Sequence, residues 1–120
     1  YKSDVEKLIS QLIEEGYLNE ERFAIQFAGG KFRMKKWGRI KIQYELRLKK
    51  ISSFNIKKAL AEIDEDEYEK TLFALVSAKW KALKNEQHLN RVVKTKNYLL
   101  QKGFEPLLID GCIKKLREKE

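Results

Sequence analysis

The chain has 120 residues, of which 42% are hydrophobic and 37% charged, and its formal net charge is +8. This length allows a modest core, and the apolar content excludes a wholly disordered tail. The positive charge favours acidic partners, with nucleic acid the commonest and an anionic membrane or an acidic protein surface as alternatives.

The single cysteine, Cys112, excludes an intrachain disulfide and a cysteine-based zinc site. No apolar run approaches the ~20 residues that cross a bilayer, and no signal-like stretch follows the N-terminus. We therefore predict a cytoplasmic protein that is not inserted into a membrane. Because the chain starts at Tyr1, inside an amphipathic pattern, we expect it to be a fragment or a trimmed product.

One proline in 120 residues and few alternating β-branched runs predict an all-helical protein. Capping residues mark the helix starts, with Ser3 or Asp4 for the first helix, Asn19 for the second and Ser52 for the fourth. In chain order, the expected helices cover about 3–15, 20–37, 39–49, 53–63, 65–83, 88–102 and 106–119.

Two parts of the chain repeat one another. Lys31-Phe32-Arg33 aligns with Lys79-Trp80-Lys81, and the second alignment, shifted by five residues, places Leu46, Lys49, Ile51, Ile56, Ala59 and Leu60 on Leu99, Lys102, Phe104, Ile109, Cys112 and Ile113. This predicts tandem three-helix, helix-turn-helix-like repeats in an elongated, curved body. The expected segments are the last helix of a truncated repeat (1–16) and two complete repeats (17–64 and 65–120).

The repeat register also predicts which side chains form the core. We expect Phe23, Leu46, Ile56 and Leu60 to be buried, and Trp80 and Cys112 to be core residues, whereas the role of Trp37 stays open.

Catalytic groups are weakly represented. The only histidine, His88, lies at an expected helix start, and the acidic run 64–67 suits a helix N-terminus better than a metal site. Gly29-Gly30 lacks the spacing of a phosphate loop and is expected to let two helices approach closely. We therefore predict a protein that is not an enzyme and that needs no cofactor or metal.

The segment 30–50 contains nine basic residues and one acidic residue. Charge runs are usually solvated helix faces, but like charges four residues apart destabilise a helix, so a cluster without compensating acids indicates an anionic partner. The predicted partner-binding or DNA-binding residues are Arg22, Lys31, Arg33, Lys35, Lys36, Arg39, Lys41, Lys79, Lys81, Arg91 and Lys94. A structural salt bridge is the alternative role for Arg22.

Two motifs, GYLNEERFA at 16–24 and GRIKIQYELRLKKI at 38–51, resemble those of the RecX family of bacterial recombination regulators. Lys50 stands where that family usually has glycine, and Gly103 restores the glycine in the following repeat. The resemblance implies a monomeric, non-enzymatic protein that binds RecA and its DNA-bound filament, lodges in the filament groove and inhibits ATPase, recombinase and co-protease activities.

Two other functions remain open from the sequence. An autonomous helix-turn-helix-like module could bind single- or double-stranded DNA directly, with Gln43 and Arg47 as the nearby candidates for reading base edges. A scaffold that binds an acidic protein without DNA is the third.

Overall fold

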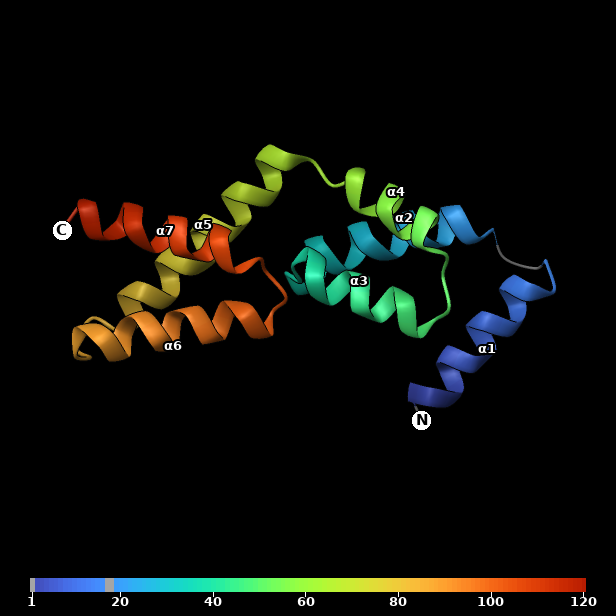
Figure 1. Cartoon of the computed structure of the whole chain (residues 1–120), viewed down its shortest axis with the longest axis horizontal. Helices are drawn as coiled ribbons and strands as arrows, with labels where there is room; N and C mark the ends of the chain where they lie inside the picture. The colour runs from blue at the N-terminus through green and yellow to red at the C-terminus, as the bar shows by residue number, and fades with distance from the viewer. Residues whose placement is uncertain (1, 17–18) are drawn as a thin grey trace. The chain divides into compact units, whose positions relative to one another are not determined.

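The computed structural model describes residues 2–16 and 19–120, except for the side chains of Lys2 and Ser3. Every element in this part of the chain is a helix, which confirms the all-helical prediction (Figure 1). The elements are α1 (Lys2–Glu14), α2 (Glu20–Gly30), the π-helical turn η1 (Lys31–Lys35), α3 (Arg39–Leu48), α4 (Ser53–Ala61), α5 (Glu65–Ala82), α6 (His88–Gln101) and α7 (Pro106–Glu118). Because α1 begins at Lys2, Ser3 and Asp4 lie inside this helix, and the prediction that one of them caps its start is wrong. The motif residues Tyr17 and Leu18 lie outside the described residues.

Local capping explains where three of the helices begin. The side chains of Asn19 and Ser52 accept hydrogen bonds from backbone N–H groups three residues later, at 2.9 and 3.3 Å, as the sequence predicted. Asp64 does the same for α5, where its carboxylate accepts the N–H of Glu67 at 2.9 Å. The acidic run 64–67 therefore caps a helix and complements its positive N-terminal end.

The chain forms two compact units. Unit 1 comprises residues 1–35 and 42–63, and unit 2 comprises residues 36–41 and 64–120. Helix α3 thus contributes its first residues to unit 2 and the remainder to unit 1. The division into the three segments 1–16, 17–64 and 65–120 stays a prediction.

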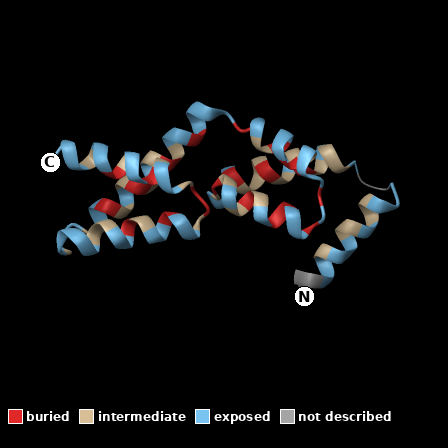
Figure 2. Ribbon diagram, viewed as in Figure 1, coloured by how far each residue is buried: buried red, intermediate tan, exposed pale blue. Residues whose placement is uncertain are grey.

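The core of unit 1 lies where α2 packs against α4 (Figure 2). Ala24 and Ala28, one turn apart on α2, are fully buried, and their small side chains allow this close packing. The other buried apolar residues of the unit are Phe32, Ile42, Leu46, Ile51, Ile56, Ala59 and Ile63.

The predicted burial in unit 1 is confirmed for two of four side chains. Leu46 and Ile56 are buried, whereas Phe23 and Leu60 are only partly buried. Ala24 points into the core, and the side chain of Phe23 is rotated about 100° from it around the helix axis. The Phe23 ring therefore lies at the edge of the core, where it stacks on Phe27 with ring centroids 5.9 Å apart.

The core of unit 2 is formed by α5, α6 and α7, each of which contacts the other two. Tyr68, Leu72, Val76 and Trp80 recur every four residues along α5 and are all buried, which confirms the prediction for Trp80. Leu99, Phe104, Ile109 and Ile113 complete this core from α6, α7 and the turn between them. Cys112 is half-buried, and this burial raises the pKa of its thiol.

Both units end their middle helix with the same turn. Lys50 has φ 59° and Gly103 has φ 93°, so both are left-handed. In each case the next residue donates its N–H to a carbonyl five positions back, Ile51 to Leu46 and Phe104 to Leu99, both at 3.2 Å. This Schellman geometry supports the predicted repeat register, because the aligned residues end their helices in the same way.

The left-handed turn at Lys50 leads to a stability prediction. Replacing Lys50 by glycine is expected to raise stability by about 1 kcal/mol, because glycine avoids the steric cost that a Cβ carries at positive φ. The same change at Lys57, an exposed position inside α4, should lower stability by about 1 kcal/mol. Urea unfolding of both variants measures the difference, and a loss of stability in both would contradict the left-handed turn.

The glycine pair in α2 does not act as predicted. A Cβ added at Gly30 would meet nothing within 4 Å, and one at Gly29 would meet the guanidinium of Arg33 from the next turn. The prediction that Gly29-Gly30 allows two helices to approach closely is therefore wrong. The close approach occurs at Gly38 and Gly103 in unit 2.

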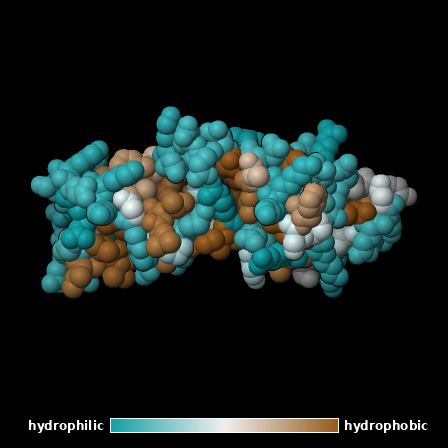
Figure 3. Space-filling model, turned by 45° about the horizontal axis from the view of Figure 1, so that its top comes forward, coloured by the Kyte–Doolittle hydropathy of each residue, from teal (hydrophilic) through white to brown (hydrophobic). Residues whose placement is uncertain are grey.

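Hydrophilic side chains cover much of the face shown in Figure 3, with apolar side chains exposed between them. Among the residues that the structure describes, the most exposed large apolar side chains are those of Leu107 at 83% and Met34 at 82%. Across the described ranges 2–16 and 19–120, none of the helices combines the length and apolarity that crossing a membrane requires.

Candidate nucleic-acid interface

The first part of the basic segment is the π-helical turn of unit 1. Phe32 is buried in the core and holds this turn in place, while Arg33 and Lys35 are exposed on it. Lys31 lies with its Nζ 5.5 Å from the centroid of the Phe27 ring. Single π-helical turns are rare and occur frequently at functional sites, so the cations here are displayed on an unusual backbone.

The second part of the basic segment belongs to unit 2. Lys36 is exposed and left-handed, with φ 58°, and it begins the non-helical stretch that leads to Gly38. Trp37 is half-buried, and the Nζ of Lys41 lies 4.6 Å from the centroid of its ring. Trp37 therefore has at least one partner within its own unit.

Backbone contacts fix this part of the segment to the rest of unit 2. A Cβ on Gly38 would lie 2.4 Å from the carbonyl carbon of Gly103, and a Cβ on Gly103 would lie 2.3 Å from the Cβ of Lys41. The N–H of Gly38 donates to the carbonyl of Lys102 at 2.7 Å, and the N–H of Ile40 donates to that of Gly103 at 2.9 Å. No larger residue fits at either glycine without moving the backbone.

Three successive N–H groups at the start of α3 are therefore satisfied by distant residues, since the N–H of Arg39 donates to the Tyr68 hydroxyl at 3.0 Å. The first N–H groups of a helix have no partners within it and usually take a local capping side chain. Gly38 has no side chain to offer, so the turn after α6 and the hydroxyl of Tyr68 cap α3 in its place.

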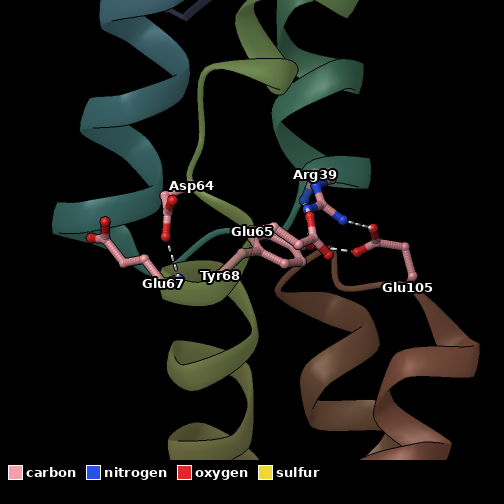
Figure 4. A network of polar contacts seen from close by, with 6 residues as sticks. All are labelled: Arg39, Asp64, Glu65, Glu67, Tyr68 and Glu105. Atoms are coloured by element: carbon pink, nitrogen blue, oxygen red, sulfur yellow. Dashed lines mark hydrogen bonds and ion pairs between the residues drawn. The ribbon is translucent and has the colours of Figure 1, made fainter.

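The side chain of Arg39 joins a polar network within unit 2 (Figure 4). Its guanidinium donates to Glu105 at 2.7 Å and pairs with Glu65, and its carbon Cζ lies 3.8 Å from the centroid of the Tyr68 ring. Tyr68 donates its hydroxyl proton to Glu105. Glu105 occupies the N-cap position of α7 but makes no side-chain cap there, because its carboxylate is engaged by Arg39 and Tyr68.

The ionisation states within this network follow from burial and pairing. Burial, with the hydrogen bond to Glu105, raises the pKa of Tyr68, so the phenol keeps its proton and stays a donor. Burial acts to lower the pKa of Arg39, but the hydrogen bond and charge of Glu105 outweigh it and the pKa is raised. The network therefore holds a charged guanidinium and a neutral phenol at neutral pH.

The predicted cations of the second repeat have several different partners. Arg91 is the most constrained, since its Nε donates to the carbonyl of Trp80 at 2.9 Å and its Nη1 pairs with Glu120 at 3.2 Å. Lys94 pairs with Glu86 at 2.5 Å. Lys79 lies with its Nζ 4.6 Å from the centroid of the Tyr98 ring, and Lys81 is exposed.

The eleven predicted contact residues therefore fall into three groups. Five are exposed cations: Arg22, Arg33, Lys35, Lys36 and Lys81. Three lie over aromatic rings: Lys31, Lys41 and Lys79. Three are engaged in ion pairs within unit 2: Arg39, Arg91 and Lys94. Arg39 and Arg91 are not counted among the residues proposed to contact a partner, because their guanidinium groups already bind acidic side chains.

Sequence reasoning missed Tyr68 and Glu105 as partners of Arg39. Glu105 directly precedes Pro106, where a capping role was the only local signal, and it lies 66 positions from Arg39 along the chain. The catalytic candidates gain no support. His88 is exposed at the start of α6, its ring edge-on to Trp80 with centroids 6.1 Å apart. In the part of the chain that the structure describes, no group of three or more His, Cys, Asp or Glu could hold a metal ion.

Comparisons with known proteins agree with one another. Residues 19–60 match the family described as RecX, second three-helix domain. The Regulatory protein RecX of Bacillus cytotoxicus is 23% identical over 116 residues, which are 97% of this chain and 43% of that protein. Its counterpart in Oceanobacillus iheyensis is 26% identical over the same shares of both chains.

A solved structure shows a similar fold. The crystal structure of a regulatory protein RecX matches with a TM-score of 0.70 at 19% identity, covering 83% of this chain and 49% of that one. At that identity the likeness shows the fold alone. The chain spans less than half the length of these curated relatives. The family resemblance predicted from the two motifs is confirmed.

Proposed function

We propose that this chain is a member of the RecX family and that it regulates a RecA recombinase by binding RecA and its DNA-bound filament. Its basic segment contacts phosphates inside the filament, and the bound chain impedes filament assembly and ATP hydrolysis. The protein acts by occupying the filament and catalyses no reaction itself.

The observation that carries this proposal is a long acid-free stretch in which four of the seven cations are exposed. Residues 22–44 contain seven basic residues and no acidic residue. Arg33, Lys35 and Lys36 are exposed on this stretch, on a π-helical turn and a left-handed residue. Positive charges that lie so close in the chain repel one another unless an anion neutralises them, and phosphates provide closely spaced negative charge.

The salt dependence of binding tests the contact surface. Replacing Arg33 and Lys35 together by glutamine should reduce the slope of log K against log salt by about 1.4 to 1.8, because each lost phosphate contact releases one fewer counterion. Binding of the variant to a RecA filament on a labelled oligonucleotide, measured from low to physiological salt, gives the slope. The same variant should inhibit RecA's DNA-dependent ATPase more weakly.

A matched variant controls for the loss of charge. Replacing Lys114 and Arg117 by glutamine also removes one lysine and one arginine, both from the exposed surface of α7. We expect this variant to keep most of the wild-type slope and inhibition. Equal effects of the two variants would show that only net charge matters and would contradict a defined contact surface.

The ratio of protein to DNA separates this function from autonomous DNA binding. A regulator of the filament should inhibit the ATPase at amounts well below those needed to coat the DNA. Inhibition that appears only at coating amounts would favour the helix-turn-helix-like alternative, in which DNA alone is the target.

A further inference from the structure

Residues 31–41 contain six basic side chains, and one of them, Arg39, is bound to acidic residues. Arg39 lies between Lys36 and Lys41 in the sequence, yet its side chain is only 22% exposed and is bound to Glu65 and Glu105. Lys36 is exposed, and Lys41 is partly exposed over Trp37. A purely electrostatic view of the segment would count all three as phosphate contacts.

We propose that Arg39 is a positioning residue, which holds Lys36 and Lys41 in their binding arrangement on unit 2 through Glu105 and Tyr68 and makes no phosphate contact itself. This inference rests on the proposed function, since it concerns how the same basic segment is presented to the filament. It assigns to Glu105, an acidic residue, a role in favour of binding an anion.

The backbone supports this role. Residues 36–38 are not helical, and Lys36 holds a left-handed conformation that costs free energy for any residue with a Cβ. Such a stretch keeps one conformation only when its surroundings fix it. Here the fixing contacts are the hydrogen bonds from Gly38, Arg39 and Ile40 to Lys102, Tyr68 and Gly103.

The side chains reinforce those backbone contacts. The Tyr68 hydroxyl accepts the N–H of Arg39 and donates to Glu105, and Glu105 accepts in turn from the Arg39 guanidinium. The three groups thus form a closed ring of hydrogen bonds around the first residue of α3. Removing one member takes a hydrogen bond away from the others in a partly buried place, which loosens the anchor of the segment.

The charge of Glu105 allows a test, because a purely electrostatic role and a positioning role of this residue predict opposite changes in binding affinity. If the segment acts only through its charge, Glu105→Gln removes a negative charge near it and should strengthen binding to an anion. If Glu105 positions the segment, the same change should weaken binding. An anchored arrangement that falls to a tenth of the population gives about tenfold weaker binding, because only that fraction is competent.

The experiment measures binding of the chain to a fluorescein-labelled single-stranded oligonucleotide and to a RecA filament on that oligonucleotide. We expect Glu105→Gln and Arg39→Gln each to weaken binding by about tenfold with the salt slope unchanged, because the bound state still makes the same phosphate contacts. The double variant should be little weaker than either single variant, since both changes break one network.

Two further variants keep the test decisive. Tyr68→Phe retains the buried ring and removes only the hydroxyl, so it should also weaken binding if the unit stays folded by circular dichroism. Glu118→Gln removes an exposed acidic residue at the end of α7 and should leave binding unchanged or slightly stronger.

Each outcome separates the two proposals. Tighter binding by Glu105→Gln, or a slope reduced by about 0.7 to 0.9 in Arg39→Gln, would overturn the positioning role while leaving the proposed function intact. If the wild-type chain binds neither probe, the proposed function itself fails, and the positioning role fails with it.

Discussion

Replacing Gly103 by alanine is expected to destabilise unit 2 by roughly 2 to 5 kcal/mol, because it combines a left-handed backbone with an overpacked contact. Gly103 has φ 93°, and an added Cβ would lie 2.5 Å from the backbone nitrogen of Lys41. Neither the backbone of Lys41 nor that of Gly38 can move aside without breaking the hydrogen bonds that cap α3. Urea or thermal unfolding measures the loss.

Gly111 provides the matched control for this prediction. It lies inside α7, and an added Cβ would meet nothing within 4 Å, so Gly111→Ala should raise stability by about 0.5 to 1 kcal/mol. The same substitution thus has opposite expected signs at two positions of one unit. If Gly103→Ala were as stable as Gly111→Ala, the close approach between Gly38 and Gly103 would not exist in solution.

Replacing Leu46 by alanine is expected to lower the free energy of unfolding by about 2 to 5 kcal/mol. Leu46 is completely buried in unit 1, and its carbonyl also accepts the N–H that closes the turn after α3. The truncation removes apolar contacts and leaves a cavity beside α3. Chemical unfolding of the variant and the wild type gives the difference.

The control for Leu46→Ala makes the same chemical change on the surface. Leu107 is 83% exposed in the first turn of α7, so Leu107→Ala should change stability by less than about 0.5 kcal/mol. An unchanged melting temperature in Leu46→Ala would mean that α3 does not pack as the structure shows.

Helix positions could be predicted from the sequence because their signals are local. Asn19 and Ser52 cap residues only three positions away, and the stripe from Tyr68 to Trp80 repeats at helical spacing. The left-handed turn at Lys50 could be expected from the glycine at the aligned position 103. In each case the interacting groups lie within one or two helical turns of one another.

The depth of burial was harder to predict, because it depends on how each helix is rotated. Phe23 and Leu60 lie beside inward-facing positions and are only partly buried, although the pattern of apolar residues fits either rotation. The π-helical turn shifts the positions after Gly30 relative to those of α2, and no residue in the sequence marks this change of period.

The roles of the cations were the least predictable part. Lys35 and Arg39 look alike in a basic run, but the first is exposed and the second is bound to Glu65 and Glu105. Similarly, Arg91 stacks on Trp80, with its Cζ 3.9 Å from the ring centroid. The acidic partners of Arg39 and Arg91 lie far away in the chain, and only the folded structure brings these residues together.

The capping of α3 has a consequence for the order in which the protein folds during synthesis. A ribosome completes α3 well before Tyr68 emerges, 29 positions after Arg39, and longer still before Glu105, 66 positions after it. Until then the first N–H groups of α3 can bond only to water, and the basic stretch before the helix has nothing to dock on. Contacts between such distant residues are costly to close and form late. A nascent chain that carries only the first unit would therefore lack the contacts that fix residues 36–38, and the arrangement of Lys36 and Lys41 would be completed only when the turn before α7 and Glu105 have been made.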